Sequence, residues 1–203
     1  MLPPRLAPYQ IVIVPIYKPN DSEGKGKVLN QVSIITTALK TKGIRVKVDD
    51  REGITPGFKF NEWEQKGVPL RLEFGLRDLD KGIGLIASRI ADGKEEYRLD
   101  EVANRVLDML ENFHHQLYQR AKSFREQKSF EVSSYEEFKE KIEEGFVYAA
   151  HCGDPESEAA IQEETKATPR CIPLEGPSAE GLSCFHTGKP SAYPRKVIFA
   201  KAY

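Results

Sequence analysis

Residues 51–78 read REGITPGFKFNEWEQKGVPLRLEFGLRD and contain a helix signal followed by a strand signal. Thr55 before Pro56 is typical of a helix start, because threonine caps free amides and proline fits the first helical position. We expect this short helix to end at Gly67. From Val68 to Phe74 apolar residues occupy every second position, which is the period of a strand with one apolar and one charged face. The stretch therefore predicts a helix and a strand of a layered α/β domain.

The flanking segments continue the alternation of strands and helices. The run at 10–16 is β-rich without strict alternation, as expected for a strand buried on both faces. Residues 44–49 alternate between apolar and charged, which predicts a strand whose Asp49 faces water. The expected elements are strands at 10–16, 44–49, 68–74, 83–89 and 96–99, helices at 28–39, 55–67 and 100–127, a loop at 20–27 and a charged turn at 75–82. Together they predict an α/β fold with a mixed β-sheet flanked by helices.

A second domain is expected after the long helix. The composition shifts at 128–134, and Ser134 with Glu137 forms a capping box for a helix that runs to Gly145. The rest of this part is loop-rich, with short strands expected at 146–150 and 196–202. We therefore divide the chain into a linker at 1–8, a domain at 9–127 and a small α+β C-terminal domain at 128–203.

The composition excludes several classes of protein. With 203 residues, of which 39% are hydrophobic and 30% charged, the chain can form one large or two small domains with buried cores. No apolar run approaches the ~20 residues of a membrane span and no secretory signal is present, so we expect a cytoplasmic protein with no membrane partner. The three cysteines, an odd number, do not suggest a disulfide framework. Because the net charge is −1, any nucleic-acid contact depends on a local surface.

The candidate binding residues also lie in the stretch 51–78. Planar donors, carboxylate acceptors and aromatic rings suit the recognition of unstacked RNA bases by their Watson–Crick edges. Guanine offers N–H donors to a carboxylate and oxygen or nitrogen acceptors to an arginine. In a plainer interpretation, Phe60 and Trp63 belong to the core and Arg71 lies beside Glu73 on a solvated strand face. The candidates are Lys59, Glu64, Arg71, Arg77 and Asp78.

The same stretch is similar to the anticodon-binding domain of prolyl-tRNA synthetases of the archaeal and eukaryotic type. In that family the pattern R-x-x-x-x-P-G-x-K-F-x-x-W-E-x-x-G-V-P-x-R-x-E-x-G-x-K/R-D recurs, and residues 51–78 fill each fixed position. The segments LPPRLAP, GFVYAAHCG, IQEETKATPRCIP and FAKAY also resemble the family. The resemblance covers essentially the whole chain, as the C-terminal part of such an enzyme: an anticodon-binding domain followed by a zinc-type C-terminal domain.

The resemblance implies a class II anticodon-binding fold that reads the anticodon loop of proline tRNA, whose last two bases are guanines. Carried over by position, the five candidates contact those guanines, with Lys59 the weaker one. In the parent proline–tRNA ligase a separate catalytic domain binds ATP, Mg and proline, and the enzyme is a homodimer. We therefore expect this chain to hold no catalytic residue and to be inactive alone. Tyr203 is expected near the parent active site.

The tail of many relatives carries four cysteines as a zinc cage, in a C-G-x-x-x-C pair and a C-x-x-C-G pair. In this chain two ligand positions are kept and two are lost: Cys152 and Cys184 remain, and Ser157 and Thr187 stand at the other two. Structural zinc takes four thiolate or imidazole ligands, and a hydroxyl is a poor substitute. His151 and His186, beside the cysteines, offer a Cys₂His₂ alternative. We expect packing to replace the metal, and no cofactor in this chain.

Two other functions fit parts of the sequence. An anticodon-binding-like domain reused as a protein interaction or regulatory module would have the same fold. Such a module has no chemical reason to keep Glu64, Arg71, Arg77 and Asp78 together. An independent metal-dependent enzyme built on the tail lacks a complete ligand set and an evident general base. We therefore favour anticodon recognition.

Overall fold

The computed structural model describes residues 2–202, so Tyr203 lies outside the described residues. They form two compact units that divide between Gln119 and Arg120. The first contains β1 (Ile11–Ile16), α1 (Ser22–Thr41), β2 (Val46–Val48), α2 (Pro56–Gln65), β3 (Leu70–Gly75), α3 (Leu76–Lys81), β4 (Ile83–Ser88), β5 (Lys94–Arg98) and most of α4 (Val102–Gln127). The second contains β6 (Ser129–Glu131), α5 (Tyr135–Lys141), β7 (Phe146–Ala149), α6 (Pro155–Thr165), β8 (Ala167–Cys171) and β9 (Val197–Lys201). The division falls inside α4, whereas the sequence predicts a boundary at the end of that helix.

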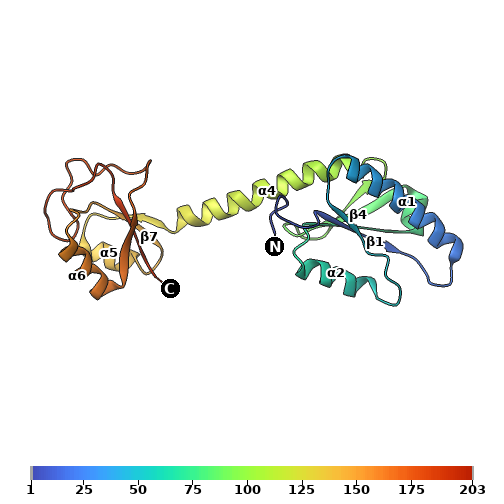
Figure 1. Ribbon diagram of the computed structural model, residues 1–203, viewed down its shortest axis with the longest axis horizontal. Coiled ribbons are helices and arrows are strands. Elements are labelled where there is room, and N and C mark those ends of the chain that lie inside the picture. The colour runs from blue at the N-terminus through green and yellow to red at the C-terminus, as the bar shows by residue number, and fades with distance from the viewer. Residues whose placement is uncertain (1, 203) are drawn as a thin grey trace. The chain divides into compact units, whose positions relative to one another are not determined.

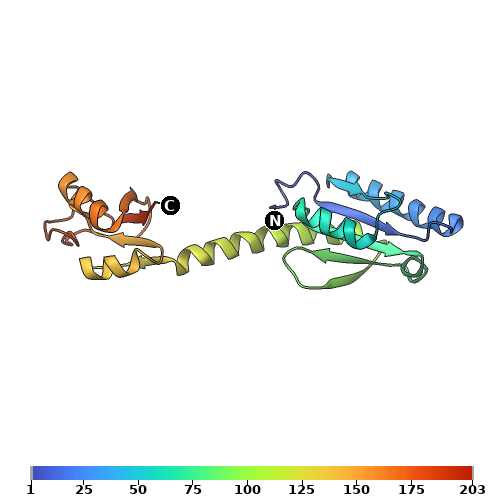
Figure 2. The same ribbon diagram turned by 90° about the horizontal axis from the view of Figure 1, so that it is seen from below.

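The first unit is built on a mixed sheet with the strand order β2-β1-β3-β4-β5. β1 pairs in parallel with both β2 and β3, whereas β4 is antiparallel to both β3 and β5. α1 and α2 lie on opposite faces of this sheet (Figure 1), and the β4–β5 hairpin forms one of its edges (Figure 2). The expected fold class, a mixed sheet flanked by helices, is confirmed.

The two faces of this sheet are covered unequally. On one face, apolar side chains of α1 and α4 pack against Leu70, Leu72 and Phe74 of β3 in the large core. On the other face the core is small, and consists of Val12, Val14, Trp63 and Val68, with Phe60 packed against it. Because successive residues of a strand point to opposite faces, Arg71 and Glu73 lie on the face that α2 covers. The candidate Arg71 and its neighbour Glu73 are therefore on the less apolar side of the sheet.

α1 begins at Ser22, so the loop expected at 20–27 is wrong over most of its length. Asp21 caps the helix by accepting a hydrogen bond from the backbone amide of Gly24 at 2.8 Å. A Cβ at position 24 would collide with the Asp21 carboxylate, so the cap requires glycine there. The glycines at 24 and 26 interrupt the apolar pattern, so the sequence does not reveal the first turns of the helix.

The charged turn expected at 75–82 is also wrong, because α3 occupies most of it. The Asp78 carboxylate accepts a hydrogen bond from the Gly75 amide at 2.9 Å and caps the helix start. Gly82, with a φ of +70°, ends the helix in the left-handed conformation that glycine adopts without strain. α3 has no fully buried residue, and its apolar side consists only of Leu76 and Leu79, which is too short a pattern to reveal a helix from the sequence.

The second unit has its own sheet, with the strand order β6-β7-β9-β8. β6 and β7 are parallel, and β9 is antiparallel to both of its neighbours. Ser134 caps α5 as predicted, with its hydroxyl oxygen 3.2 Å from the Glu137 amide. The expectation of loops is wrong for 155–171, which form α6 and β8. In residues 2–202 no helix combines the length and the apolar character that crossing a membrane requires.

Candidate nucleic-acid interface

Four of the candidate residues form two groups at opposite ends of β3. Arg71 is near the start of β3, and Glu64 lies beside it in the last turn of α2. Arg77 and Asp78 lie in the first turn of α3, directly after β3 ends at Gly75. Strands rise about 3.3 Å per residue, so Arg71 and Gly75 are roughly 13 Å apart along the strand. The structure therefore joins Glu64 to Arg71, but separates this pair from Arg77 and Asp78.

Arg71 is the centre of the first group. Its Nη1 donates a hydrogen bond to Glu64 Oε1 at 2.8 Å, and its guanidinium lies over the Phe60 ring, 4.0 Å from the ring centroid. Arg71 is 9% exposed, whereas the side chain of Glu64 keeps 43% of its surface exposed. A guanidinium held on an aromatic ring beside an accessible carboxylate presents a donor and an acceptor to a flat polar ligand.

Three further charged residues belong to this group, although none of them is among the candidate binding residues from the sequence. Glu73 is buried and pairs with Lys94 of β5, and its Oε2 lies 3.6 Å from Arg71 Nε. Arg89 donates a hydrogen bond from Nη1 to the backbone oxygen of Glu64. The alternation along β3 was sufficient to place Glu73 on the face of Arg71. Lys94 and Arg89 could not be found in the same way, because the position of Arg89 depends on the register of β4 with β3 and that of Lys94 also on the register of β5 with β4.

The second group is smaller and more exposed. One carboxylate oxygen of Asp78 is used by the cap of α3, where it accepts the Gly75 amide at 2.9 Å. Arg77 is exposed and makes no hydrogen bond or ion pair within residues 2–202. Its guanidinium is therefore available to a ligand at the end of β3.

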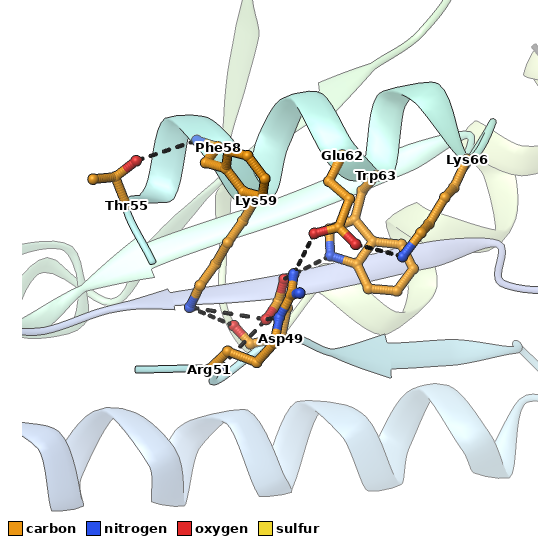
Figure 3. A network of polar contacts seen from close by, with 8 residues as sticks. All are labelled: Asp49, Arg51, Thr55, Phe58, Lys59, Glu62, Trp63 and Lys66. Carbon is orange, nitrogen blue, oxygen red and sulfur yellow. Dashed lines mark hydrogen bonds and ion pairs between the residues drawn. The ribbon is translucent and has the colours of Figure 1, made fainter. Parts of the chain in front are cut away.

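Lys59 contacts neither group and instead belongs to the network of Figure 3. Its Nζ is 3.2 Å from the backbone oxygen of Asp49 and 3.9 Å from Asp49 Oδ1. Both residues are buried. Figure 3 shows Lys59 and Trp63 reaching from α2 toward Asp49. The expectation that Asp49 faces water is wrong, because β2 ends at Val48 and the side chains of α2 close over the next residue.

Asp49 receives hydrogen bonds from two segments. Arg51 donates from Nε and Nη2 at 2.8 and 2.7 Å, and Trp63 donates from Nε1 at 2.7 Å. Burial alone would raise the pKa of Asp49, but these hydrogen bonds and the Lys59 ammonium outweigh it and lower the pKa to about 2. Arg51 also donates to Glu62 at 2.6 Å. The network therefore fastens α2 to the segment after β2.

The two retained cysteines lie together in the second unit. The ligand atoms of His151, Cys152 and Cys184 are within 4.8 Å of one another. Cys152 Sγ is 3.4 Å from the Thr187 hydroxyl oxygen, and the Ser157 hydroxyl oxygen is 3.2 Å from His151 Nε2. The fold thus gathers the residues that stand at the zinc positions of the resembling family, together with both neighbouring histidines.

The polar groups of this cluster already satisfy one another. The Gly153 amide donates to His151 Nδ1 at 3.1 Å, so the ring proton is on Nε2 and is donated to Ser157. The Ser157 hydroxyl donates in turn to His186 Nδ1 at 2.7 Å. Burial lowers the pKa of His151, so its ring is neutral at neutral pH. His151 has no lone pair left for a metal, and two thiols with two hydroxyls do not fit the ligand set of structural zinc.

Comparisons with known proteins account for both units. Residues 10–109 match the family model described as "Anticodon binding domain", and residues 135–203 match the one described as "Prolyl-tRNA synthetase, C-terminal". Over its full length the chain is 46% identical to the proline–tRNA ligases of Roseiflexus sp. (strain RS-1) and Porphyromonas gingivalis (strain ATCC BAA-308 / W83), and 48% identical to that of Chloroflexus aurantiacus (strain ATCC 29366). It spans 42%, 40% and 42% of the length of these relatives. In sequence order the chain is therefore similar first to an anticodon-binding domain, at residues 10–109, and then to the C-terminal domain of prolyl-tRNA synthetases, at residues 135–203.

Proposed function

We propose that the chain reads the anticodon of proline tRNA as part of a proline–tRNA ligase of the archaeal and eukaryotic type. The observation that carries the proposal is the pair of Arg71 and Glu64, in which the Arg71 guanidinium lies over Phe60 on the α2 face of the sheet. The pair offers the donor and the acceptor that a guanine edge requires, in a domain whose family binds anticodons. The subtype is supported by the sequence pattern of residues 51–78.

Each of the two groups takes one guanine in this proposal. The O6 and N7 of guanine accept hydrogen bonds from an arginine, and its N1–H and N2–H groups donate to a carboxylate. Arg71 with Glu64 supplies both functions at one end of β3, and Arg77 with Asp78 supplies them at the other. These ends are roughly 13 Å apart, whereas stacked neighbouring bases are about 3.4 Å apart. The two guanines must therefore be unstacked to be read at the same time.

The remainder of the enzyme supplies the chemistry. The chain spans 42% of the Roseiflexus relative, and ATP, Mg and proline are assigned to a catalytic domain in the remaining part. This catalytic domain and a second subunit are the proposed partners, in the cytoplasm. The position of Tyr203 near the active site stays a prediction, because that residue is outside the described residues. The 203-residue chain given ATP, proline and tRNA is expected to form no prolyl-tRNA, and measurable aminoacylation would contradict this assignment.

Replacement of Arg71 tests the proposal directly. Arg71→Ala is expected to weaken binding of a proline anticodon stem-loop by about 1–3 kcal/mol and to relax discrimination at one guanine. Binding is measured by fluorescence anisotropy against loops in which each guanine is replaced by adenine. Arg77→Ala is the matched variant and is expected to relax discrimination at the other guanine. If Arg71→Ala weakens binding of all these loops equally, Arg71 contacts a phosphate and does not read a base.

The second unit is proposed to fold without a metal. The hydrogen bonds among His151, Ser157 and His186 support this, because they occupy the groups that a metal would need. Elemental analysis of protein purified without added zinc is expected to find far less than one zinc per chain. Near-stoichiometric zinc would contradict the proposal.

A further inference from the structure

Glu73 is a buried carboxylate that the recognition scheme above leaves without a role. It is 2% exposed and lies on the α2 face of β3, two residues after Arg71. Burial of a charged carboxylate is costly unless cations compensate it, and an apolar residue of similar size often serves stability as well or better. Stability of the sheet alone therefore does not explain a glutamate at this position.

Glu73 holds two cations that come from different strands. Its Oε1 pairs with Lys94 Nζ of β5, and its Oε2 lies 3.6 Å from Arg71 Nε. Ala87 of β4 is in register with both Arg71 and Lys94, so the two cations flank one small side chain. Both cations also lie over the Phe60 ring, 4.0 and 5.2 Å from its centroid. The carboxylate and the ring together keep the two cations side by side.

The pairing of Glu73 with Arg71 is incomplete. Arg71 Nε and Glu73 Oε2 are buried, and neither has a hydrogen-bond partner in the part of the chain that the structure describes. A buried donor and a buried acceptor left in this way cost stability, and such groups in native proteins call for an explanation, which is often functional. The explanation here is geometric. The negative charge of Glu73 orients the Arg71 guanidinium, while the hydrogen bond of that guanidinium goes to Glu64.

We propose that Glu73 is a positioning residue for guanine recognition. It does not touch the base. It fixes the plane of the Arg71 guanidinium over Phe60, and keeps Lys94 beside it, so that Arg71 and Glu64 meet the guanine edge without rearrangement. This inference rests on the proposed function, because it assigns a role to Glu73 in reading the same base.

Glu73→Gln is the decisive variant, since it removes the charge and keeps the size. Anisotropy titrations use the proline anticodon stem-loop and the loop with adenine in place of the guanine that Arg71→Ala identifies. We expect affinity for the guanine loop to fall about ten-fold and affinity for the adenine loop to stay unchanged. The salt dependence of binding should also stay unchanged, because no phosphate contact is lost. Equal losses for both loops would overturn the proposal.

A matched control is available on the same face of the sheet. Glu96 of β5 is exposed. It is in register with Leu85 of β4, which is in turn in register with Glu73 of β3. Glu96→Gln therefore removes the same charge from the same face of the sheet, two strand spacings or roughly 10 Å from Glu73, without releasing Arg71. It is expected to leave the ratio of the two affinities unchanged. A control that loses discrimination as strongly as Glu73→Gln would show a general effect of charge, which also overturns the proposal.

The double variant of Glu73 and Arg71 distinguishes a positioning role of Glu73 from other roles. In an Arg71→Ala background, Glu73→Gln is expected to cause no further loss, because Glu73 acts through that guanidinium. A second ten-fold loss there would contradict the inference.

Glu73→Asp is the alternative variant if circular dichroism shows that Glu73→Gln does not fold. It keeps the charge but moves it, so it should lose part of the discrimination between the two loops. Full retention of that discrimination would overturn the proposal. A wild-type chain that does not distinguish guanine from adenine would instead contradict the proposed function itself.

Discussion

The substitution Asp49→Asn tests whether the buried carboxylate fastens α2 to the sheet. Asp49 accepts from Arg51 at 2.8 and 2.7 Å and from Trp63 at 2.7 Å, and the Lys59 ammonium lies 3.9 Å away. Asparagine has the same size but no charge, and one of its two polar atoms can only donate. The Lys59 ammonium would stay buried without its counter-ion. We expect the free energy of unfolding to fall by about 3 kcal/mol at pH 6, at the low end of what breaking a buried ion pair costs.

The pH dependence of this effect follows from the pKa of Asp49. That pKa is lowered from the ordinary value of 3.8 to about 2, and each pKa unit corresponds to about 1.4 kcal/mol. A carboxyl group with a lowered pKa stabilises the fold above its unfolded pKa, and this stabilisation is lost as the pH falls through the folded pKa. The difference between wild type and Asp49→Asn should therefore shrink by about 1 kcal/mol at pH 3 and by about 2 kcal/mol at pH 2.

The assay is urea unfolding followed by the fluorescence of Trp63, which is the only tryptophan in the chain and a member of the network. Asp50→Asn is the control, because it makes the same chemical change at an exposed neighbouring position. The control is expected to stay within about 0.5 kcal/mol of wild type at each pH. The reasoning is refuted if Asp49→Asn does the same, or if its deficit is equally large at pH 6 and pH 3.

Three further predictions concern other parts of the chain. Arg71→Lys keeps the charge but loses the planar guanidinium on Phe60, so guanine discrimination in anisotropy titrations should fall by about 1 kcal/mol, and an unchanged ratio would contradict stacking as its basis. The double variant Ser157→Cys with Thr187→Cys restores four thiols and should bind one zinc per chain in elemental analysis; a metal-free double variant would show that the cluster cannot form a zinc cage. Gly24→Ala should lower stability by about 1–2 kcal/mol in thermal unfolding, because the new methyl group displaces the Asp21 cap, whereas Gly26→Ala, which meets no neighbouring atom, should not.

The α2–β3 segment could be predicted closely from the sequence. Thr55 caps α2 as expected, with its hydroxyl oxygen 3.4 Å from the Phe58 amide. Leu70, Leu72 and Phe74 are buried in the large core, in agreement with the period of two, but the solvated strand face considered for Arg71 and Glu73 is wrong, because both are buried on the opposite face. These signals are local, because a cap, a proline and an alternation depend only on residues that are close in sequence. The candidate pair of Glu64 and Arg71 comes from this segment, which is why its two members were identified together.

The remaining site residues depend on contacts that local patterns do not contain. The partners of Asp49 lie two, ten and fourteen positions away in the sequence, and the last two reach it only once α2 has packed on the sheet. Lys94 contacts Glu73 only because β4 pairs in register with β3 and β5 pairs in register with β4. α6 was missed because its buried residues are Ser157, Ile161 and Thr165, which form no apolar stripe. Its cap, Asp154 before a proline, was the usable signal.

The alternation that builds the large core also places the charged residues of the binding face. Because Leu70, Leu72 and Phe74 pack with α1 and α4, Arg71 and Glu73 must both point toward α2. A slip of one residue in β3 would put both charges into the core, so selection for the core also fixes this pair. Phe60 covers Arg71, but Glu64 stays partly exposed beside it. Substitutions that keep the apolar period and alter only the charges at 71 or 73 should therefore fold, and lose recognition.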